Sequence, residues 1–454
     1  MTLVESVDHE LAGAGLSQGA VEVISTAKND PEWLHARRLA SWELFQRLPM
    51  PSRRDEHWRF TNLRKVKLDD VTAYSPAPEG FAGSVSVADD QVVGETEAAG
   101  HVSQVNGDTT AIVNVNLPAG VIFTSLEEAA RTHPELVQRH LGTAVKAGDS
   151  VNDKFVALNE ATWTGGVFLY VPRGVRVEQP LRANLLHAGD GTTLSWRALI
   201  VLEESAEATF VEEYGSADNA HAGFSNGVIE LIANADSNLH YVTAQNYATP
   251  VAHFATHRVI AERDSQVEWA AVGLGASLGK SRMEARLVGA NSTVKLTGAY
   301  FLDGTQELDY DTQQFHEAPN AMSDLAFKGV LTDRSRSVWR GMIDVAEGAQ
   351  GTDSYQENRN LILSDGAHAD SIPGLQIEAN EVRCTHGSTT GKVDEEQLFY
   401  LQARGLTRLE ATKAIVRGFF VPVLDRITVD SVRDSIREAL YARMDRVAED
   451  VAGE

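Results

Sequence analysis

The sequence predicts a mostly β protein, built as a β-helix with α-helical regions at both ends. Residues 111–385 form a succession of short Val-, Ile-, Leu-, Thr- and Tyr-rich runs broken by small polar residues, which is typical of strands and turns. Similar units recur along this stretch, whereas both ends of the chain have apolar residues at helical spacing. We therefore expect a helical region with a linker (1–110), the β-helix core (111–393) and a second helical region (394–454).

The N-terminal region is expected to contain a well-marked helix. Asp30-Pro31 is a typical start, because an acidic capping residue precedes proline at the first helical position. The apolar residues that follow have helical spacing: Leu39, Trp42 and Phe45. Two prolines within residues 48–60 end this helix. Residues 69–110 show little pattern and are expected to be a linker or an irregular entry segment.

The central region repeats itself with a period of about 28 residues. Each unit has an apolar strand, a tight polar turn and a second alternating strand, as in 200–212, 231–243, 259–271 and 286–298. Ser237, Ser265 and Ser292 occupy equivalent turn positions, 28 and 27 residues apart. A propeller blade needs four strands in about 40 residues, so one coil of a β-helix fits this unit better. A double-layer sandwich is the alternative.

The C-terminal region is predicted to form three helices. Three acids, 394–396, charge a first turn, and Gly405 closes that helix. Thr407 and Glu410 form a capping box for the second helix, which Pro422 bends or ends. Apolar stripes at helical spacing follow in the last two helices: Ile415, Phe419 and Val423, then Val432, Ile436, Leu440 and Met444. Such stripes usually face a core, and a short helical region is also a natural docking surface.

Composition excludes several classes of function. The 64 acids and 40 bases give a net charge of -24, which disfavours binding to nucleic acid. One basic run, residues 53–67, contains acids as well, and a solvated face is the better interpretation. A single cysteine excludes an internal disulfide framework. No signal peptide and no run of about 18 apolar residues is present, so we expect a cytoplasmic protein with no membrane contact.

Two further motifs are weighed and set aside. The Gly-rich stretch 273–281 lacks the spacing of a phosphate-binding loop and lies between predicted strands. His253 and His257 lie four residues apart, which on a strand is about 13 Å, too far to share a metal ion. Paired carboxylates of a carbohydrate-active enzyme remain an alternative, because 64 acids allow many pairings. A structural solenoid without chemistry is the second alternative.

Cys384, the only cysteine, lies two residues before His386. On a strand these side chains share one face, about 6–7 Å apart, and Glu378 and Asn380 share it too if the strand is straight. An inert buried thiol beside a hydrogen-bonded histidine is the alternative interpretation. An iron–sulfur cluster normally takes four protein ligands, so a cluster here would borrow ligands from another chain.

The C-terminal part of the sequence resembles the Suf iron–sulfur cluster assembly family, in particular its SufD branch. The resemblance is dense over residues 358–406, in the motifs Pro-x-Leu-x-Ile-Glu from Pro373, Cys-x-His-Gly from Cys384 and Asp-Glu-Glu-Gln-Leu-Phe-Tyr-Leu from Asp394. Residues 52–63 resemble the N-terminal motif of the branch. Asp365 stands where the SufB branch has a key cysteine, which favours SufD. The implied core is a right-handed parallel β-helix.

The resemblance implies a scaffold rather than an enzyme. It implies that the chain pairs with a SufB paralogue through the β-helix cores and that a nascent cluster forms at their interface, near His386 and Cys384. It also implies that the C-terminal helices bind the SufC ATPase, and the side chains expected to dock it are Leu398, Leu401, Leu409, Ile415 and Phe419. No cofactor is expected to be stably bound by the chain alone. A homodimer is plausible for the isolated chain.

Overall fold

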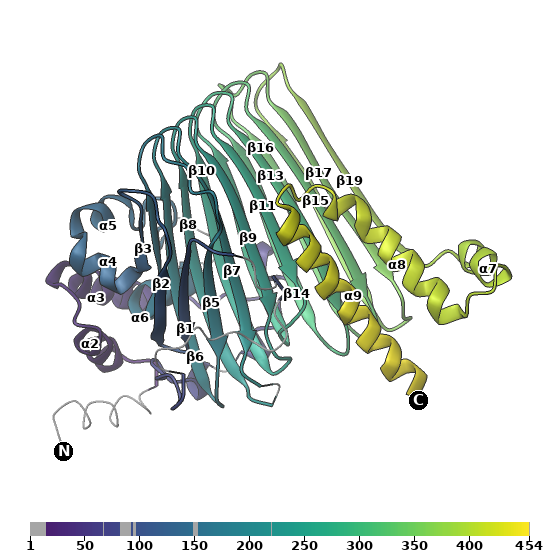
Figure 1. The fold of residues 1–454 in the computed structure, drawn as a ribbon, viewed down its shortest axis with the longest axis horizontal. Coiled ribbons are helices and arrows are strands. Elements are labelled where there is room, and N and C mark those ends of the chain that lie inside the picture. Colours follow the sequence, from purple (N-terminus) through teal and green to yellow (C-terminus); the bar gives the residue numbers. More distant parts are fainter. Residues whose placement is uncertain are drawn as a thin grey trace.

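The centre of the molecule is a parallel β-solenoid with helices at both ends (Figure 1). The computed structural model describes residues 15–66, 68–81, 92–93, 97–148, 153–218 and 220–453. Consecutive strands alternate between two sheets, and each strand pairs in parallel with the strand two places away, as β10 pairs with β8 and β12. A sandwich of antiparallel hairpins would instead pair consecutive strands, so the predicted β-helix is confirmed.

Nineteen strands are described, ten in sheet A and nine in sheet B. Sheet A contains β1 (Gly100–Val105), β2 (Asp108–Asn114), β5 (Leu181–His187), β7 (Glu207–Ser216), β9 (Asn238–Asn246), β11 (Gln266–Gly273), β13 (Thr293–Leu302), β15 (Met322–Leu331), β17 (Asp353–Ile362) and β19 (Arg383–Lys392). Sheet B contains β3 (Ile122–Ser125), β4 (Gly165–Val171), β6 (Thr192–Leu202), β8 (Gly223–Ala233), β10 (Val251–Ala261), β12 (Leu278–Leu287), β14 (Glu307–His316), β16 (Arg336–Val345) and β18 (His368–Ile377). Antiparallel pairs occur only at the N-terminal end of this described set, between β1 and β2 and between β3 and β4.

The repeated serines lie at one corner of successive coils. The hydroxyls of Ser237 and Ser265 each donate to the carbonyl three residues earlier, 2.6 Å away in both cases, and close the turn. Ser292 does the same toward Gly289 at 2.7 Å. The residues before the first two, Asp236 and Asp264, have φ of 58° and 60°, a left-handed conformation that short polar side chains tolerate. The periodic Asp/Asn-Ser signal in the sequence therefore marks the corners of the solenoid.

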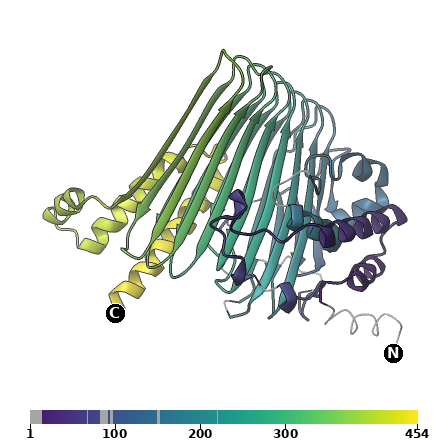
Figure 2. The same cartoon turned by 180° about the vertical axis from the view of Figure 1, so that it is seen from behind.

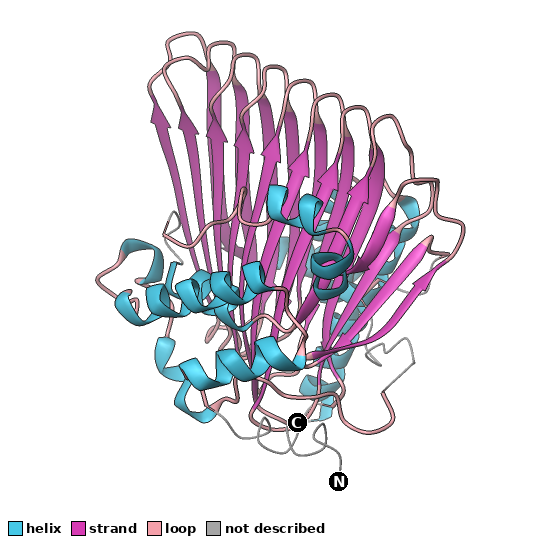
Figure 3. Cartoon of the chain, turned by 90° about the vertical axis from the view of Figure 1, so that its left-hand side faces the viewer, coloured by secondary structure: helices cyan, strands magenta, loops and turns pink. Residues whose placement is uncertain are grey.

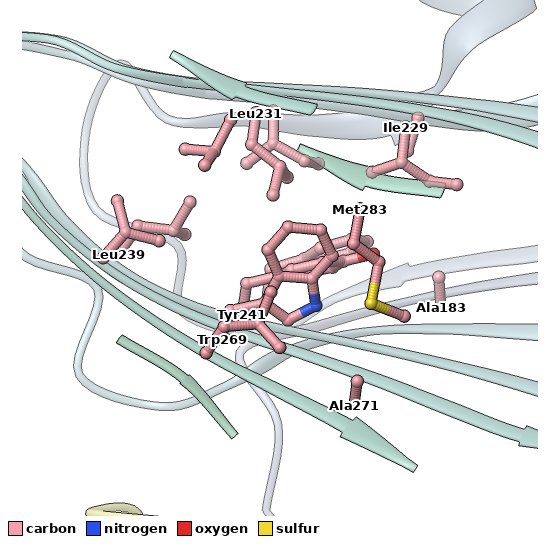
Figure 4. Packing of buried hydrophobic residues seen from close by; sticks show 14 of the residues in the cluster. Ala183, Ile229, Leu231, Leu239, Tyr241, Trp269, Ala271 and Met283 are labelled. Carbon is pink, nitrogen blue, oxygen red and sulfur yellow. The ribbon is translucent and has the colours of Figure 1, made fainter. Parts of the chain in front are cut away.

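The interior between the sheets is filled by apolar and aromatic side chains. Figure 4 shows Tyr241 and Trp269 of sheet A in contact in this space, with Leu231 and Met283 reaching in from sheet B. All four are almost fully buried. Parallel coils stack these side chains in rows, and this interior is the main hydrophobic core.

Helices interrupt the region that the sequence suggested to be continuous strand. Between β3 and β4 lie α4 (Leu126–Thr132), α5 (Pro134–His140) and α6 (Asp153–Thr162). Their apolar faces pack on apolar side chains at the outer side of sheet B, and this burial stabilises them as helices. The expected linker is also partly wrong, since β1 and β2 lie largely within residues 69–110.

The N-terminal helices are α2 (Gln18–Ala27) and α3 (Glu32–Arg47). Figure 3 looks onto this end and shows helices gathered over it. Trp42 and Phe45 are buried as predicted, but Asp30 does not cap α3. Its carboxylate instead pairs with the buried guanidinium of Arg38 at 2.6 Å, because leaving a buried cation unpaired costs more free energy than leaving a helix end uncapped.

After α3 the chain crosses the outer face of sheet B as a strap, residues 48–66, with the short 3-10 helices η1 (Glu56–Trp58) and η2 (Leu63–Lys65), followed by η3 (Leu68–Asp70) (Figure 2). His57 Nδ1 lies 2.5 Å from Asp311 of β14, and Arg340 of β16 donates to the carbonyl of Glu56 at 2.6 Å. The arginines of the basic run, residues 53, 54, 59 and 64, are exposed as predicted, and Lys67 lies outside the described residues.

The C-terminal helices are α7 (Glu395–Ala403), α8 (Arg408–Leu424) and α9 (Asp430–Gly453). Helices α8 and α9 lie on the outer face of sheet A, where their buried side chains form a cluster with those of β9, β11, β13 and β15, while α7 stands away from the solenoid (Figure 1). The capping box of Thr407 and Glu410 is confirmed, and Pro422 lies in the last turn of α8. None of the helices that the structure describes is long and apolar enough to cross a membrane.

Candidate functional site

Cys384 and His386 lie on β19, the last strand of sheet A. They pair in register with Ser354 and Gln356 of β17, whose side chains are buried inside the solenoid. Cys384 and His386 therefore belong to the inward face of the final coil, as the period of two predicted. No described strand stacks beyond β19, so Cys384 is only half-buried and His386 is exposed.

The facing strand, β18, presents the second half of this surface. Its residues Leu375 and Ile377 continue the inward rows of Ile343 and Val345, yet they are 38% and 39% exposed. We call the inward side of the last coil the open face; its residues are Pro373, Leu375 and Ile377 of β18 with Cys384, His386, Ser388 and Thr390 of β19. An apolar row thus faces a polar row at an end of the solenoid that no described coil covers.

The thiol of Cys384 is held in its neutral form. It packs against an apolar cluster that includes Ile343 and Val345. Burial, followed by the negative charge of Asp353, raises the pKa of Cys384 above its ordinary value. Since the thiolate is the ligand form, Cys384 needs a nearby cation or metal before it can coordinate.

The two residues do not make a complete metal site within this chain. Among the described residues there is no group of three or more His, Cys, Asp or Glu side chains placed to hold a metal ion. The suggestion that Asn380 extends the ligand face is wrong, because β19 begins only at Arg383. The backbone N–H of Asn380 instead donates to Gln350 in the turn before the strand. What remains is a pair of side chains on the open face.

Asp365 lies at the other end of the same coil. It is exposed in the turn between β17 and β18 and pairs with Lys392 at 2.5 Å. Lys392 follows Cys384 by eight positions on β19, a distance of about 26 Å along a strand. A ligand at position 365 could therefore not join Cys384 and His386 in one chain.

The expected docking side chains of the C-terminal helices differ in exposure. Leu398 is buried, and Leu401 is half-buried. Ile415 and Phe419 are half-buried against the apolar cluster between the helices and sheet A, so they hold α8 in place rather than face solvent. Of the five, only Leu409 is exposed.

The exposed apolar side chains of this region are Phe399, Tyr400, Leu406, Leu409 and Val421, and the first is 74% exposed. Helical spacing did not predict the exposure of Phe399, because spacing along α7 does not show whether another element covers that side of the helix.

A buried polar network inside the solenoid escaped sequence reasoning. Glu212 of β7 accepts hydrogen bonds from Tyr214 at 2.8 Å and from Tyr241, whose hydroxyl also contacts His257 Nδ1 at 2.9 Å. Burial raises the pKa of Glu212 to about 8 and lowers that of His257 to about 3. Both side chains are therefore neutral at pH 7, and burial likewise lowers the pKa of His253 to about 3.

Comparison with known proteins identifies the family. Residues 185–419 match the SUF system FeS cluster assembly SufBD core domain, and residues 21–183 match the SufBD protein N-terminal region. An iron-sulfur cluster assembly SufBD family protein of Staphylococcus saprophyticus is 30% identical over 432 residues, covering 92% of this chain and 90% of that protein. A protein of the same description from Staphylococcus aureus is 29% identical with the same coverage. The chain described here belongs to the SufBD family of the SUF iron–sulfur cluster assembly system.

Proposed function

We propose that this chain is a SufD-type, non-enzymatic subunit of an iron–sulfur cluster assembly scaffold. It pairs with a SufB-type paralogue, and the nascent cluster is built where the two chains meet. The observation that carries the proposal is the open face, on which Cys384 and His386 form half of a ligand set. Asp365, in place of the SufB-type cysteine, supports the SufD assignment.

The geometry of the last coil favours pairing with another β-helix. The outer edges of β18 and β19 are free of a neighbouring strand among those described, so their backbone groups can extend both sheets into a partner. The exposed apolar row of Leu375 and Ile377 would be covered in the same step. The same edges would also allow the isolated chain to form a homodimer, since the two paralogues share a fold.

The cluster is cargo in this proposal, held transiently and shared between chains. Cys384 would supply a thiolate and His386 an imidazole nitrogen, and the remaining ligands come from the partner. A metal charge close to Cys384 would offset the burial and the Asp353 charge that now keep the thiol protonated. The chain itself supplies position and shielding, and no stable cofactor is expected on it alone.

The test is His386→Ala, expressed together with the SufB-type and SufC-type partners. His386 is exposed and makes no hydrogen bond with the residues described, so its loss should leave the fold and the complex intact. We expect cluster content to fall at least tenfold at unchanged subunit stoichiometry. His368→Ala, which removes another exposed histidine from the same coil, is the matched control. Full cluster content in His386→Ala would exclude the proposed site.

We further propose that the C-terminal helices recruit the SufC-type ATPase through α7 and the start of α8. Phe399 and Tyr400 are exposed on α7, whose main described packing partner is α8, and exposed aromatic side chains are typical of protein–protein interfaces. Phe399→Ala with Tyr400→Ala should abolish ATPase capture in a pull-down and leave pairing with the SufB-type chain unchanged. The control is Val421→Ala, an equally apolar exposed change farther along α8. Undiminished ATPase capture by the double variant would refute this assignment.

A further inference from the structure

The inward side chains of β17, directly beneath the open face, are polar, unlike those of β15 one coil farther in. Gln356, Asn358 and Asn360 of β17 lie in register under His386, Ser388 and Thr390 of β19. All three are buried, with exposed fractions of 0%, 0% and 3%. One coil farther in, the same rows hold Leu325, Phe327 and Gly329. The polar layer on β17 is therefore separated by the apolar layer on β15 from the buried polar network around Glu212, which lies farther inside the solenoid.

Asn358 and Asn360 satisfy one another and their neighbours. Asn360 Nδ2 donates to Asn358 Oδ1 at 2.7 Å, and the hydroxyl of Ser371 on β18 donates to the same oxygen at 2.8 Å. Tyr300 donates to Asn360 Oδ1 at 2.5 Å. These bonds connect sheet A to sheet B and give the amide groups of both asparagines hydrogen-bond partners.

Gln356 differs from the two asparagines, because the oxygen of its amide has no hydrogen-bond partner among the described residues. Nε2 donates to the carbonyl oxygen of Gly374 on β18 at 3.0 Å and lies 3.5 Å from that of Gly341. Both neighbours are acceptors, so the amide nitrogen must lie on that side and its orientation is fixed. Oε1 is then buried with no hydrogen-bond partner in the described chain. A Cβ on Gly341 would come within 2.4 Å of this oxygen, so a glycine gives it room.

An unpaired buried acceptor needs an explanation, since leaving one unsatisfied costs about 1–3 kcal/mol. His386 lies one strand above Gln356, on the same face, and its ring makes no hydrogen bond with any described residue. Neighbouring strands are about 4.8 Å apart, so an imidazole turned inward along the lumen brings a ring N–H over the amide of Gln356. The imidazole N–H of His386 can thus donate the hydrogen bond that Oε1 of Gln356 lacks.

We propose that Gln356 is the positioning residue of His386: its Oε1 accepts one imidazole N–H, so that the other ring nitrogen is deprotonated and faces the open end as a ligand. A ligating histidine commonly donates its second N–H to a carbonyl or carboxylate, which fixes the tautomer and the ring orientation. This inference rests on the proposed function and names the residue that prepares its ligand.

The experiment uses the complex of this chain with its SufB-type and SufC-type partners, loaded with the cluster. Gln356→Met keeps the length of the side chain and removes the acceptor. Its cluster should be lost to a chelator about 10- to 100-fold more readily than that of the wild type. Asn358→Leu is the matched control, because it removes a neighbouring brace between the same strands but leaves the acceptor of Gln356. Equal loss in both variants would make the effect structural and overturn the proposal.

A second measurement observes the hydrogen bond of the imidazole N–H in the wild-type complex. Pulsed electron paramagnetic resonance of the reduced cluster detects the remote nitrogen of a coordinated imidazole, and its quadrupole coupling depends on the hydrogen bond of the N–H. The wild-type signal should be that of a bonded N–H, and Gln356→Met should shift it; a free N–H in the wild type would overturn the proposal.

If His386→Ala keeps its cluster, the proposed function itself fails. If His386→Ala loses the cluster while Gln356→Met keeps it, only the role of Gln356 fails.

Discussion

Glu212 inside the solenoid should make the stability of the protein depend on pH in a predictable way. Burial raises its pKa from 4.5 to about 8 in the folded chain, against the opposing effect of hydrogen bonds from Tyr241 and Tyr214. In the unfolded chain the carboxyl regains its ordinary pKa. Between pH 4.5 and 8 the folded chain therefore holds a proton that the unfolded chain has released, so this group stabilises the fold below pH 4.5 and loses that contribution as the pH rises.

The magnitude follows from the shift. Each pH unit in that window is worth about 1.4 kcal/mol, so the contribution of Glu212 falls by about 3 kcal/mol from pH 4.5 to 7, and by about 5 kcal/mol by pH 8. Glu212→Gln keeps an oxygen that can accept from both tyrosines and removes the titration. The free energy of unfolding of the variant, relative to the wild type, should therefore rise by about 3 kcal/mol between pH 4.5 and 7.

Urea unfolding followed by tryptophan fluorescence measures this difference. Trp196 donates to Tyr214 at 3.0 Å and so reports directly on the network. The matched control is Glu204→Gln, the same chemical change at a surface position that is 42% exposed. A difference between Glu212→Gln and the wild type that stays constant from pH 4.5 to 8 would refute the reasoning, because it would mean that Glu212 is ionised in the fold.

Three further predictions concern the open face, the strap and the C-terminal helices. Iodoacetamide should modify Cys384 more slowly at pH 7 than it modifies free cysteine, and Asp353→Asn should speed the reaction by removing a negative charge; an unchanged rate would exclude that charge as a cause. Asp311→Ala should lower the free energy of unfolding by about 1–3 kcal/mol, because His57 and the buried Arg282 each lose an acceptor while Arg282 keeps its ion pair with Glu284, and a loss below 1 kcal/mol in urea unfolding would contradict this. Thr407→Ala should destabilise α8 by about 1 kcal/mol by breaking its capping box with Glu410, seen as faster amide exchange in the first turn; unchanged exchange would contradict it.

Local signals accounted for what sequence reasoning predicted well. The capping box of Thr407 and Glu410 involves atoms three residues apart, so the sequence alone specifies it. The corner serines form bonds that span three residues, and these repeat with each coil. The shared face of Cys384 and His386 follows from the alternation of side chains along one strand.

Errors arose where contacts beyond one helical turn or one strand–turn unit intervened. Asp30 has the chemistry of a helix cap, yet the buried guanidinium of Arg38 takes its carboxylate. Residues 126–162 were assigned to strands, but the outer side of sheet B offers an apolar surface that helices cover. Ile415 lies on a helical stripe that faces sheet A, as stripes of this kind usually face a core, and a role of this side chain in docking stays a prediction.

The sequence by itself determined the strand–turn repeat, the helical ends, and the pairing of one cysteine with one histidine on a single strand face. Only the tertiary structure decided that this strand is the last of its sheet, so that its inward face is open, and that Gln356 lies beneath His386 with an unpaired oxygen. The physical reason is that periodicity and capping depend on atoms a few residues apart. Which residues stack between coils depends instead on the length of every turn between positions 356 and 386, and on where the stack ends.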